Sequence, residues 1–86
     1  MTSAPLETAL AAKKALAGKL GIPLNDVRVV SAELVDWPDA CLGVHREGIV
    51  CAQVITPGYR VMLEAGGRII EAHSDLRGFQ IILLDN

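Results

Sequence analysis

Aromatic residues are scarce in this sequence: its 86 residues include one tryptophan, one tyrosine and one phenylalanine. With a hydrophobic fraction of 51%, the core must therefore be mainly aliphatic. Lysine and arginine are adjacent only at Lys13 and Lys14, and the net charge is −2, so we expect no nucleic-acid partner. No apolar run approaches the roughly 18 residues of a membrane span.

Features of export and of catalysis are also missing. The first residues have neither the basic nor the apolar region of a signal peptide, which leaves a cytoplasmic protein or an exported domain without its signal. No glycine-rich segment leads from a strand into a helix, and no nucleophile elbow is present. Asp36, Asp39 and Glu47 surround a tryptophan-containing loop rather than a cleft. We therefore predict a non-enzymatic protein without a cofactor, with a weak calcium site in this loop left open.

The pattern predicts one α+β domain over residues 1–86, with a single N-terminal helix over residues 4–20. Thr2 or Ser3 offers a hydroxyl cap before Pro5, and Gly21 is suited to end the helix. Within the helix, Gly18 suggests a close approach to the sheet. Aliphatic residues recur near helical spacing and predict the buried face, namely Leu6, Leu10, Leu16, Ala17 and Leu20.

The rest of the chain predicts a four- to five-stranded antiparallel meander on which the helix packs. β-branched and apolar residues place the strands at 27–36, 49–56, 59–65, 68–74 and 79–84. Pro57-Gly58 is typical of a turn between the second and third of these. The last strand is apolar on both faces, so it is either covered on both sides or offers an edge for a homodimer.

Gly66-Gly67 predicts a tight hairpin between the third and fourth strands. A two-residue loop pairs Ala65 with Arg68, Leu63 with Ile70 and Val61 with Ala72. One face of the hairpin is then apolar. On the other face His73 is interpreted as a solvated histidine beside Glu71.

Cys41 and Cys51 flank an irregular segment and are ten residues apart. A disulfide between them would add roughly 3 kcal/mol to the stability of the fold. Two reduced cysteines are the alternative, and the choice depends on the compartment. With His45 and His73 the cysteines form a zinc-type donor set, but the spacing matches no standard finger, so we predict no metal site and keep a small metal-binding domain as an alternative.

The residues that favour a binding surface lie on both sides of this irregular segment. Tryptophan, tyrosine and arginine are frequent anchors of protein interfaces. A lone loop tryptophan can equally plug the core. The predicted contact residues are Trp37, Pro38, Asp39, Gln53, Pro57, Gly58, Tyr59 and Arg60.

Four segments carry a resemblance to a known group: Trp37-Pro-Asp-Ala-Cys-Leu-Gly43, Cys51-Ala-Gln-Val-Ile-Thr-Pro-Gly-Tyr-Arg60, Glu64-Ala-Gly-Gly and His73-Ser-Asp75. They resemble small bacterial domains of uncharacterised function that often occur in exported or lipid-anchored proteins. The resemblance covers roughly residues 20–78 and transfers no catalytic residue. It implies an extracytoplasmic setting and favours the disulfide.

A second resemblance is to the cystatins, which inhibit papain-like proteases with a Gln-Val-Val-Ala-Gly loop. Gln53-Val54-Ile55-Thr56-Pro57-Gly58 is similar at the glutamine, the first valine and the final glycine. Pro57 stands where the cystatin motif has alanine, and the Trp37-Pro38 element precedes the glutamine segment instead of following it. We therefore expect a non-enzymatic module that binds a protein partner or a domain of its parent protein, with protease inhibition as the alternative.

Overall fold

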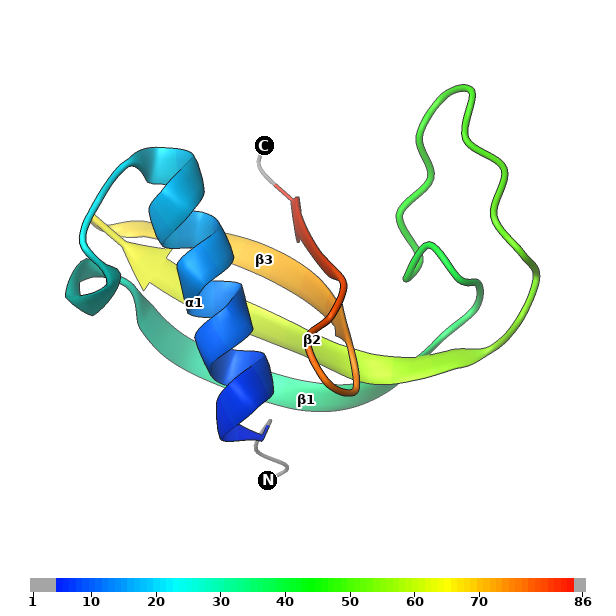
Figure 1. Cartoon of the computed structure of the whole chain (residues 1–86), viewed down its shortest axis with the longest axis horizontal. Coiled ribbons are helices and arrows are strands. Elements are labelled where there is room, and N and C mark those ends of the chain that lie inside the picture. Colours follow the sequence, from blue (N-terminus) through cyan, green and yellow to red (C-terminus); the bar gives the residue numbers. More distant parts are fainter. Residues whose placement is uncertain (1–4, 85–86) are drawn as a thin grey trace.

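One helix and a four-stranded antiparallel sheet make up the fold in the computed structural model of the chain, which describes residues 5–84 (Figure 1). The strand order in the sheet is β1-β2-β3-β4, a simple meander. The predicted α+β class is therefore confirmed, with four strands. The elements are α1 (Leu6–Leu20), the 3-10 turn η1 (Leu24–Asp26), β1 (Arg28–Trp37), β2 (Thr56–Ala65), β3 (Arg68–Asp75) and β4 (Ile81–Leu84).

The helix α1 ends where its sequence predicts. Gly21 adopts a left-handed conformation with φ 67°, and its N–H donates to the carbonyl of Ala17. Glycine takes this conformation without the steric penalty of a side chain, so the helix stops after Leu20. The hydroxyl cap expected at Thr2 or Ser3 lies outside the described residues.

The buried face of α1 differs from the one that the leucine spacing predicts. In its second half the prediction is confirmed, since Leu16 and Ala17 are buried and Leu20 packs against the core. In its first half Leu6 is 84% exposed and Leu10 is half-buried, whereas Thr8 and Ala12 are fully buried. The first half of the helix thus turns small residues toward the sheet. As a result, the side chains of Leu6 and Leu10 lie beside the buried face of the helix instead of in the core.

A close approach between α1 and the β3–β4 turn explains this choice of face. A Cβ added to Gly78 would lie 3.0 Å from the Cβ of Ala11 and 3.1 Å from the Cα of Thr8. The Thr8 hydroxyl also donates to the carbonyl oxygen of Leu76 over 2.9 Å. Gly18, by contrast, would have no atom within 4 Å of an added Cβ, so its predicted close approach to the sheet is wrong.

The β2–β3 hairpin is the part of the sheet that local sequence fixes. Ala65 pairs with Arg68, Leu63 with Ile70 and Val61 with Ala72, as predicted. Both loop glycines, Gly66 and Gly67, have positive φ values of 59° and 82°. Such values match the right-handed twist of the flanking strands, so the register follows from the turn.

The predicted strand over residues 49–56 and the Pro57-Gly58 turn are both wrong. Residues 50–55 form no regular element, and Pro57 and Gly58 lie inside β2, opposite Asp36 and Val35 of β1. The pairing of β2 with β3 begins only at Gly58. Pro57 has no N–H group to donate, but because it lies before this pairing, no hydrogen bond between β2 and β3 is lost. A β-branched composition alone is therefore insufficient to form a strand here.

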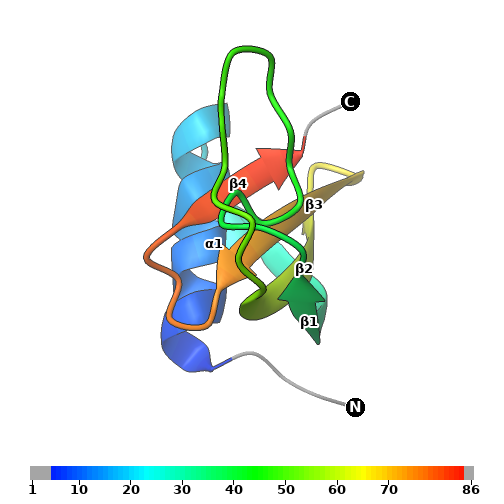
Figure 2. The ribbon, with the colours of Figure 1, turned by 90° about the vertical axis from the view of Figure 1, so that its right-hand side faces the viewer.

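Two apolar clusters lie on opposite faces of the sheet. The larger cluster lies under α1 and includes Leu16, Val61 and Leu63. The smaller cluster consists of Trp37, Leu42 and Ile82, with Val35, Val44 and Leu84 packed against it. Figure 2 shows α1 on one side of the sheet only. The second face is covered instead by residues that follow β1.

The apolar strand β4 is covered on both sides by these clusters. Ile81 and Leu83 pack against the larger one, while Ile82 and Leu84 belong to the smaller one. This is one of the two arrangements expected from the sequence. The homodimer expected from the other arrangement stays a prediction. In the described part of the chain, no helix has the length and apolar character required to cross a membrane.

Candidate binding site

The segment between β1 and β2, residues 38–55, forms a long excursion from the sheet that we call the 38–55 loop (Figures 1 and 2). A disulfide joins Cys41 to Cys51 across it, with 5.6 Å between the two Cα atoms. Beside the disulfide, the N–H of Ala40 donates to the carbonyl of Ala52 over 3.0 Å. The two arms of the loop are therefore tied together near its base, which is one of the two alternatives that the cysteine spacing left open.

Asp39 organises the first turn of this loop and has only 2% of its surface exposed. Its Oδ1 accepts hydrogen bonds from the N–H groups of Cys41 and Gly43, and its Oδ2 lies 2.7 Å from Nε2 of His45. The hydrogen bond from His45, followed by that from Gly43, lowers the pKa of the Asp39 carboxyl below its ordinary value of 3.8. The carboxylate is thus ionised near neutral pH and fixes the turn.

Trp37 and His73 connect the loop to the sheet. Their rings stack with centroids 4.0 Å apart, and Nε1 of Trp37 donates to the carbonyl of Ser74 over 3.0 Å. The Leu42 carbonyl lies 2.8 Å from Nδ1 of His73 and can only accept, so Nδ1 carries the proton. The Nε2 atom of the same ring lies 2.6 Å from a carboxylate oxygen of Glu71.

His73 is therefore not the solvated strand histidine that the alternation predicts. It is 7% exposed, because the 38–55 loop folds back over this face of the sheet. Leu42, the residue that covers it, is fully buried at a positive φ of 57°. A positive φ is uncommon for leucine, and here the hydrogen bond and the burial of the side chain hold it.

The segment around Cys51, residues 49–55, has the opposite character. Four aliphatic side chains are exposed within these seven residues: Ile49 at 58%, Val50 at 97%, Val54 at 59% and Ile55 at 69%. We call these four residues the apolar patch. Single exposed aliphatic residues are normal on protein surfaces, but four of them within one short segment favour an interaction site.

The eight predicted contact residues do not form one surface. Trp37 and Tyr59 are 7% and 8% exposed and belong to clusters on opposite faces of the sheet, so burial gives both rings a packing role. Asp39 and Gly58 are also buried. The exposed members are Pro38, Gln53, Pro57 and Arg60, and Arg60 forms a 2.6 Å ion pair with Glu33. Of these, Gln53 adjoins the apolar patch.

The exposure of the apolar patch does not follow from the sequence pattern, because its β-branched residues predict a strand over residues 49–56. Ile49-Val50 and Val54-Ile55 are adjacent pairs, whereas a half-buried strand alternates apolar and polar residues. The lack of alternation next to Cys51, together with Pro57 a few residues later, was the available signal for an exposed loop.

The donor atoms considered for zinc do not converge. Asp39, Cys41 and Cys51 place a carboxylate oxygen and two sulfurs within 4.8 Å of one another, but the disulfide uses both sulfurs. His45 bonds to Asp39, whereas His73 lies under Leu42. The Asp39 oxygens that could hold calcium already accept bonds from N–H groups and His45.

Comparison with known proteins gives one match. A family model described as a domain of unknown function (DUF8738) matches residues 9–83. No curated protein and no solved structure matches the chain. The matched range includes α1 from Ala9 onward, the whole 38–55 loop and nearly all of the sheet.

Proposed function

The chain belongs to the family of the domain of unknown function DUF8738, and we propose that it is a non-enzymatic module that binds another protein through the apolar patch. The observation that carries the proposal is the exposure of Ile49, Val50, Val54 and Ile55 on a loop whose base is covalently closed. The partner is a separate protein or a domain of a larger parent chain.

Exposed aliphatic side chains favour binding because burying them releases free energy. Each Å² of apolar surface removed from water contributes about 25 cal/mol, so one valine or isoleucine that becomes buried contributes roughly 1.5–3 kcal/mol. Val50, at 97% exposed, has almost its entire side chain available. A partner with an apolar groove would gain this energy from several neighbouring side chains at once.

The rigid base of the loop favours tight binding by limiting the entropy lost on association. The disulfide, the Asp39 turn and the His73–Leu42 hydrogen bond hold the first residues of the loop against the sheet. The apolar patch lies on either side of Cys51 in the sequence, next to this fixed base. This arrangement resembles other recognition loops that are carried on a rigid scaffold.

The chemistry around the loop supports a binding role over catalysis. The exposed His45 ring is paired with a carboxylate, as in a general base, but a base needs a nucleophile or a substrate proton within reach. The cysteine sulfurs near Asp39 are joined to each other, so neither acts as a thiolate while the disulfide is intact.

Site-specific photo-crosslinking tests the proposal. Two variants are made. A photoreactive amino acid replaces Val50 in the first, and in the second, the control, it replaces Lys14, which is exposed on α1. Both are exposed to extract of the source cells, and the products are identified by mass spectrometry. We expect a protein that crosslinks from position 50 only, and we expect the further changes V54D and I55D to abolish this product. Identical products from both positions would refute the proposal.

Protease inhibition is a second candidate because Gln53, Val54 and Ile55 are exposed and form no regular element. Unlike the cystatin loop, this segment is not a hairpin turn, since Thr56 to Gly58 already belong to β2. The test is to measure the activity of papain-type and serine-type proteases in the presence of micromolar concentrations of the protein. Inhibition that is lost in V54D supports this candidate, and full protease activity rejects it.

A further inference from the structure

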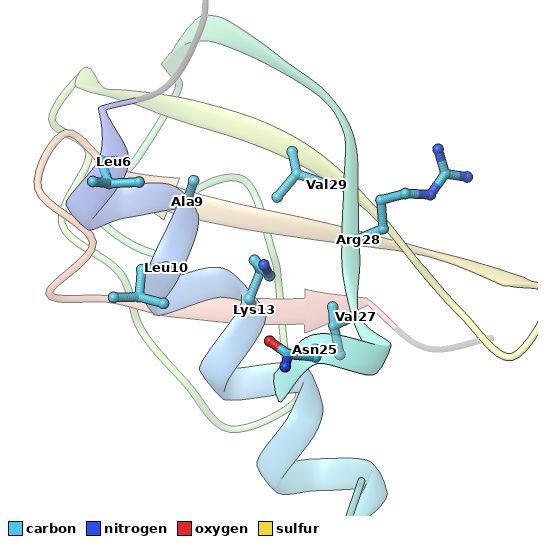
Figure 3. Close-up of a pocket in the computed structure, with 8 residues that line it drawn as sticks. All are labelled: Leu6, Ala9, Leu10, Lys13, Asn25, Val27, Arg28 and Val29. Carbon is cyan, nitrogen blue, oxygen red and sulfur yellow. The ribbon is translucent and has the colours of Figure 1, made fainter. Parts of the chain in front are cut away.

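A groove between α1 and the start of β1 lies away from the apolar patch and has no role so far (Figure 3). One wall consists of Leu6, Ala9 and Leu10 of α1, and the other of Val27 and Val29. Its volume is about 470 Å³. Sites for small molecules typically enclose 300–1,000 Å³ and are mostly apolar, so the groove has the size and the lining of such a site.

The groove exists because α1 buries its small residues. With Thr8 and Ala12 against the sheet, Leu6 and Leu10 are turned to the side of β1 instead of into the core. Helical spacing places Lys13 on the same side as these two leucines. Figure 3 shows the side chains of Leu6, Leu10 and Lys13 along α1, opposite Asn25 and Val27.

The charge of the groove has one sign. Lys13 is half-buried among the apolar walls, and none of the described residues that line the groove carries a carboxylate. In the described part of the chain, Lys13 has no hydrogen bond or ion pair. Arg28 also lines the groove, but its guanidinium is paired with Glu64 and points away from α1 in Figure 3. One ammonium group therefore lacks an anion beside an apolar surface.

We propose that this groove binds a small aliphatic carboxylate, such as a medium-chain fatty acid. Its alkyl chain would lie between Leu6 and Leu10 on one side and Val27 and Val29 on the other, with its carboxylate on Lys13. Asn25 is exposed and also lines the groove, so its amide offers a further hydrogen-bond donor. The alkyl chain of the ligand is thus complementary to the apolar walls, and its carboxylate is complementary to the ammonium group of Lys13.

The size of the groove favours a small molecule over a protein partner. A stable protein interface covers about 800 Å² on each side, far beyond this groove. β1 exposes Val30 (47%) and Leu34 (53%) as well as the charged residues Arg28 and Glu33, so its surface beyond the groove is mixed rather than continuously apolar. The binding of this ligand is independent of the function proposed for the 38–55 loop.

Nuclear magnetic resonance titration with decanoate, kept below its micelle concentration, tests the proposal on the intact chain. We expect chemical-shift changes at the amides of residues 6–13 and 27–29, and weaker binding of decanol, which has the same chain without the charge. K13Q should weaken decanoate binding about tenfold, whereas K14Q, the same change at the adjacent exposed residue, should leave it unaltered.

Four results would overturn the proposal. Shifts at the 38–55 loop instead of the groove would place the ligand elsewhere. Equal affinity for decanol and decanoate, or equal effects of K13Q and K14Q, would remove the role of Lys13. Binding to phosphatidylglycerol vesicles without any binding of free decanoate would assign the groove to a membrane surface.

Discussion

At the level of single residues, Asp39 joins local chemistry to the structure of the loop. Its two oxygens accept from two backbone N–H groups and from His45, so an ionised carboxylate is part of the folded turn. In the unfolded chain the same carboxyl has its ordinary pKa of about 3.8. A carboxyl whose pKa is lowered by folding stabilises the native state above that value, and the stabilisation disappears as the pH falls through the folded pKa.

The change D39N should therefore lower the melting temperature at pH 7, and the difference from the unaltered protein should shrink as the pH falls below about 4. Thermal unfolding followed from pH 7 to pH 2.5 measures this. Glu64, whose pKa is lowered by the N–H of Gly67 and by Arg28, keeps its own acid dependence in both proteins. A constant difference over the whole pH range would contradict the assignment.

Glycine acts at the same scale, and its effect depends on what surrounds each position. A Cβ on Gly58 would lie 1.9 Å from the carbonyl oxygen of Ser74 in the paired strand, so β2 and β3 would have to separate. We expect G58A to reduce the free energy of unfolding by more than about 3 kcal/mol.

The matched control is G18A, because Gly18 is exposed and an added Cβ would meet nothing within 4 Å. Alanine is the better helix former by roughly 1 kcal/mol, so this variant should be more stable than the unaltered protein. Urea denaturation measures both changes. Similar losses of unfolding free energy in G58A and G18A would show that the close contact of Gly58 with Ser74 does not cause the destabilisation.

At the level of elements, the 38–55 loop combines a buried first turn with an exposed returning segment. The first turn is part of the smaller cluster through Leu42, and the disulfide closes the base of the loop. The returning segment, residues 49–55, carries the apolar patch and forms no regular element. Residues 49–55 thus have a composition typical of a strand but form a loop, because no neighbouring strand pairs with them.

Removing the disulfide with C41S and C51S should reduce the free energy of unfolding by about 2–3 kcal/mol, since the open chain has more freedom when unfolded. Urea denaturation of the variant is compared with that of A40S/A52S, which changes two exposed residues beside the cysteines. The control should unfold like the unaltered protein. An unchanged midpoint in the double serine variant would mean that the disulfide adds no stability.

At the level of the whole molecule, the two faces of the sheet are covered in different ways. The helix covers one face, and the base of the 38–55 loop covers part of the other. The apolar strand β4 contributes to both clusters, so its side chains are occupied without a second copy of the chain. A homodimer formed through β4 would have to use the outer backbone edge of this strand, which is four residues long.

Local sequence determined the elements whose formation depends on neighbouring residues. The end of α1 follows from Gly21, and the register from Val61 to Ala72 follows from two loop glycines and an alternating pattern. The cysteine pairing was one of two readings that the spacing left open. For the helix end and the hairpin the contacts involve residues close in the chain, so turn chemistry and periodicity suffice.

Tertiary structure decided the features that join distant segments. The face that α1 buries depends on its approach to Gly78, and the burial of His73 depends on stacking with Trp37, 36 residues earlier in the chain. The exposure of the apolar patch depends on the absence of a strand beside it in the described sheet. Periodicity describes each segment alone, whereas these outcomes depend on which surfaces meet when the segments pack.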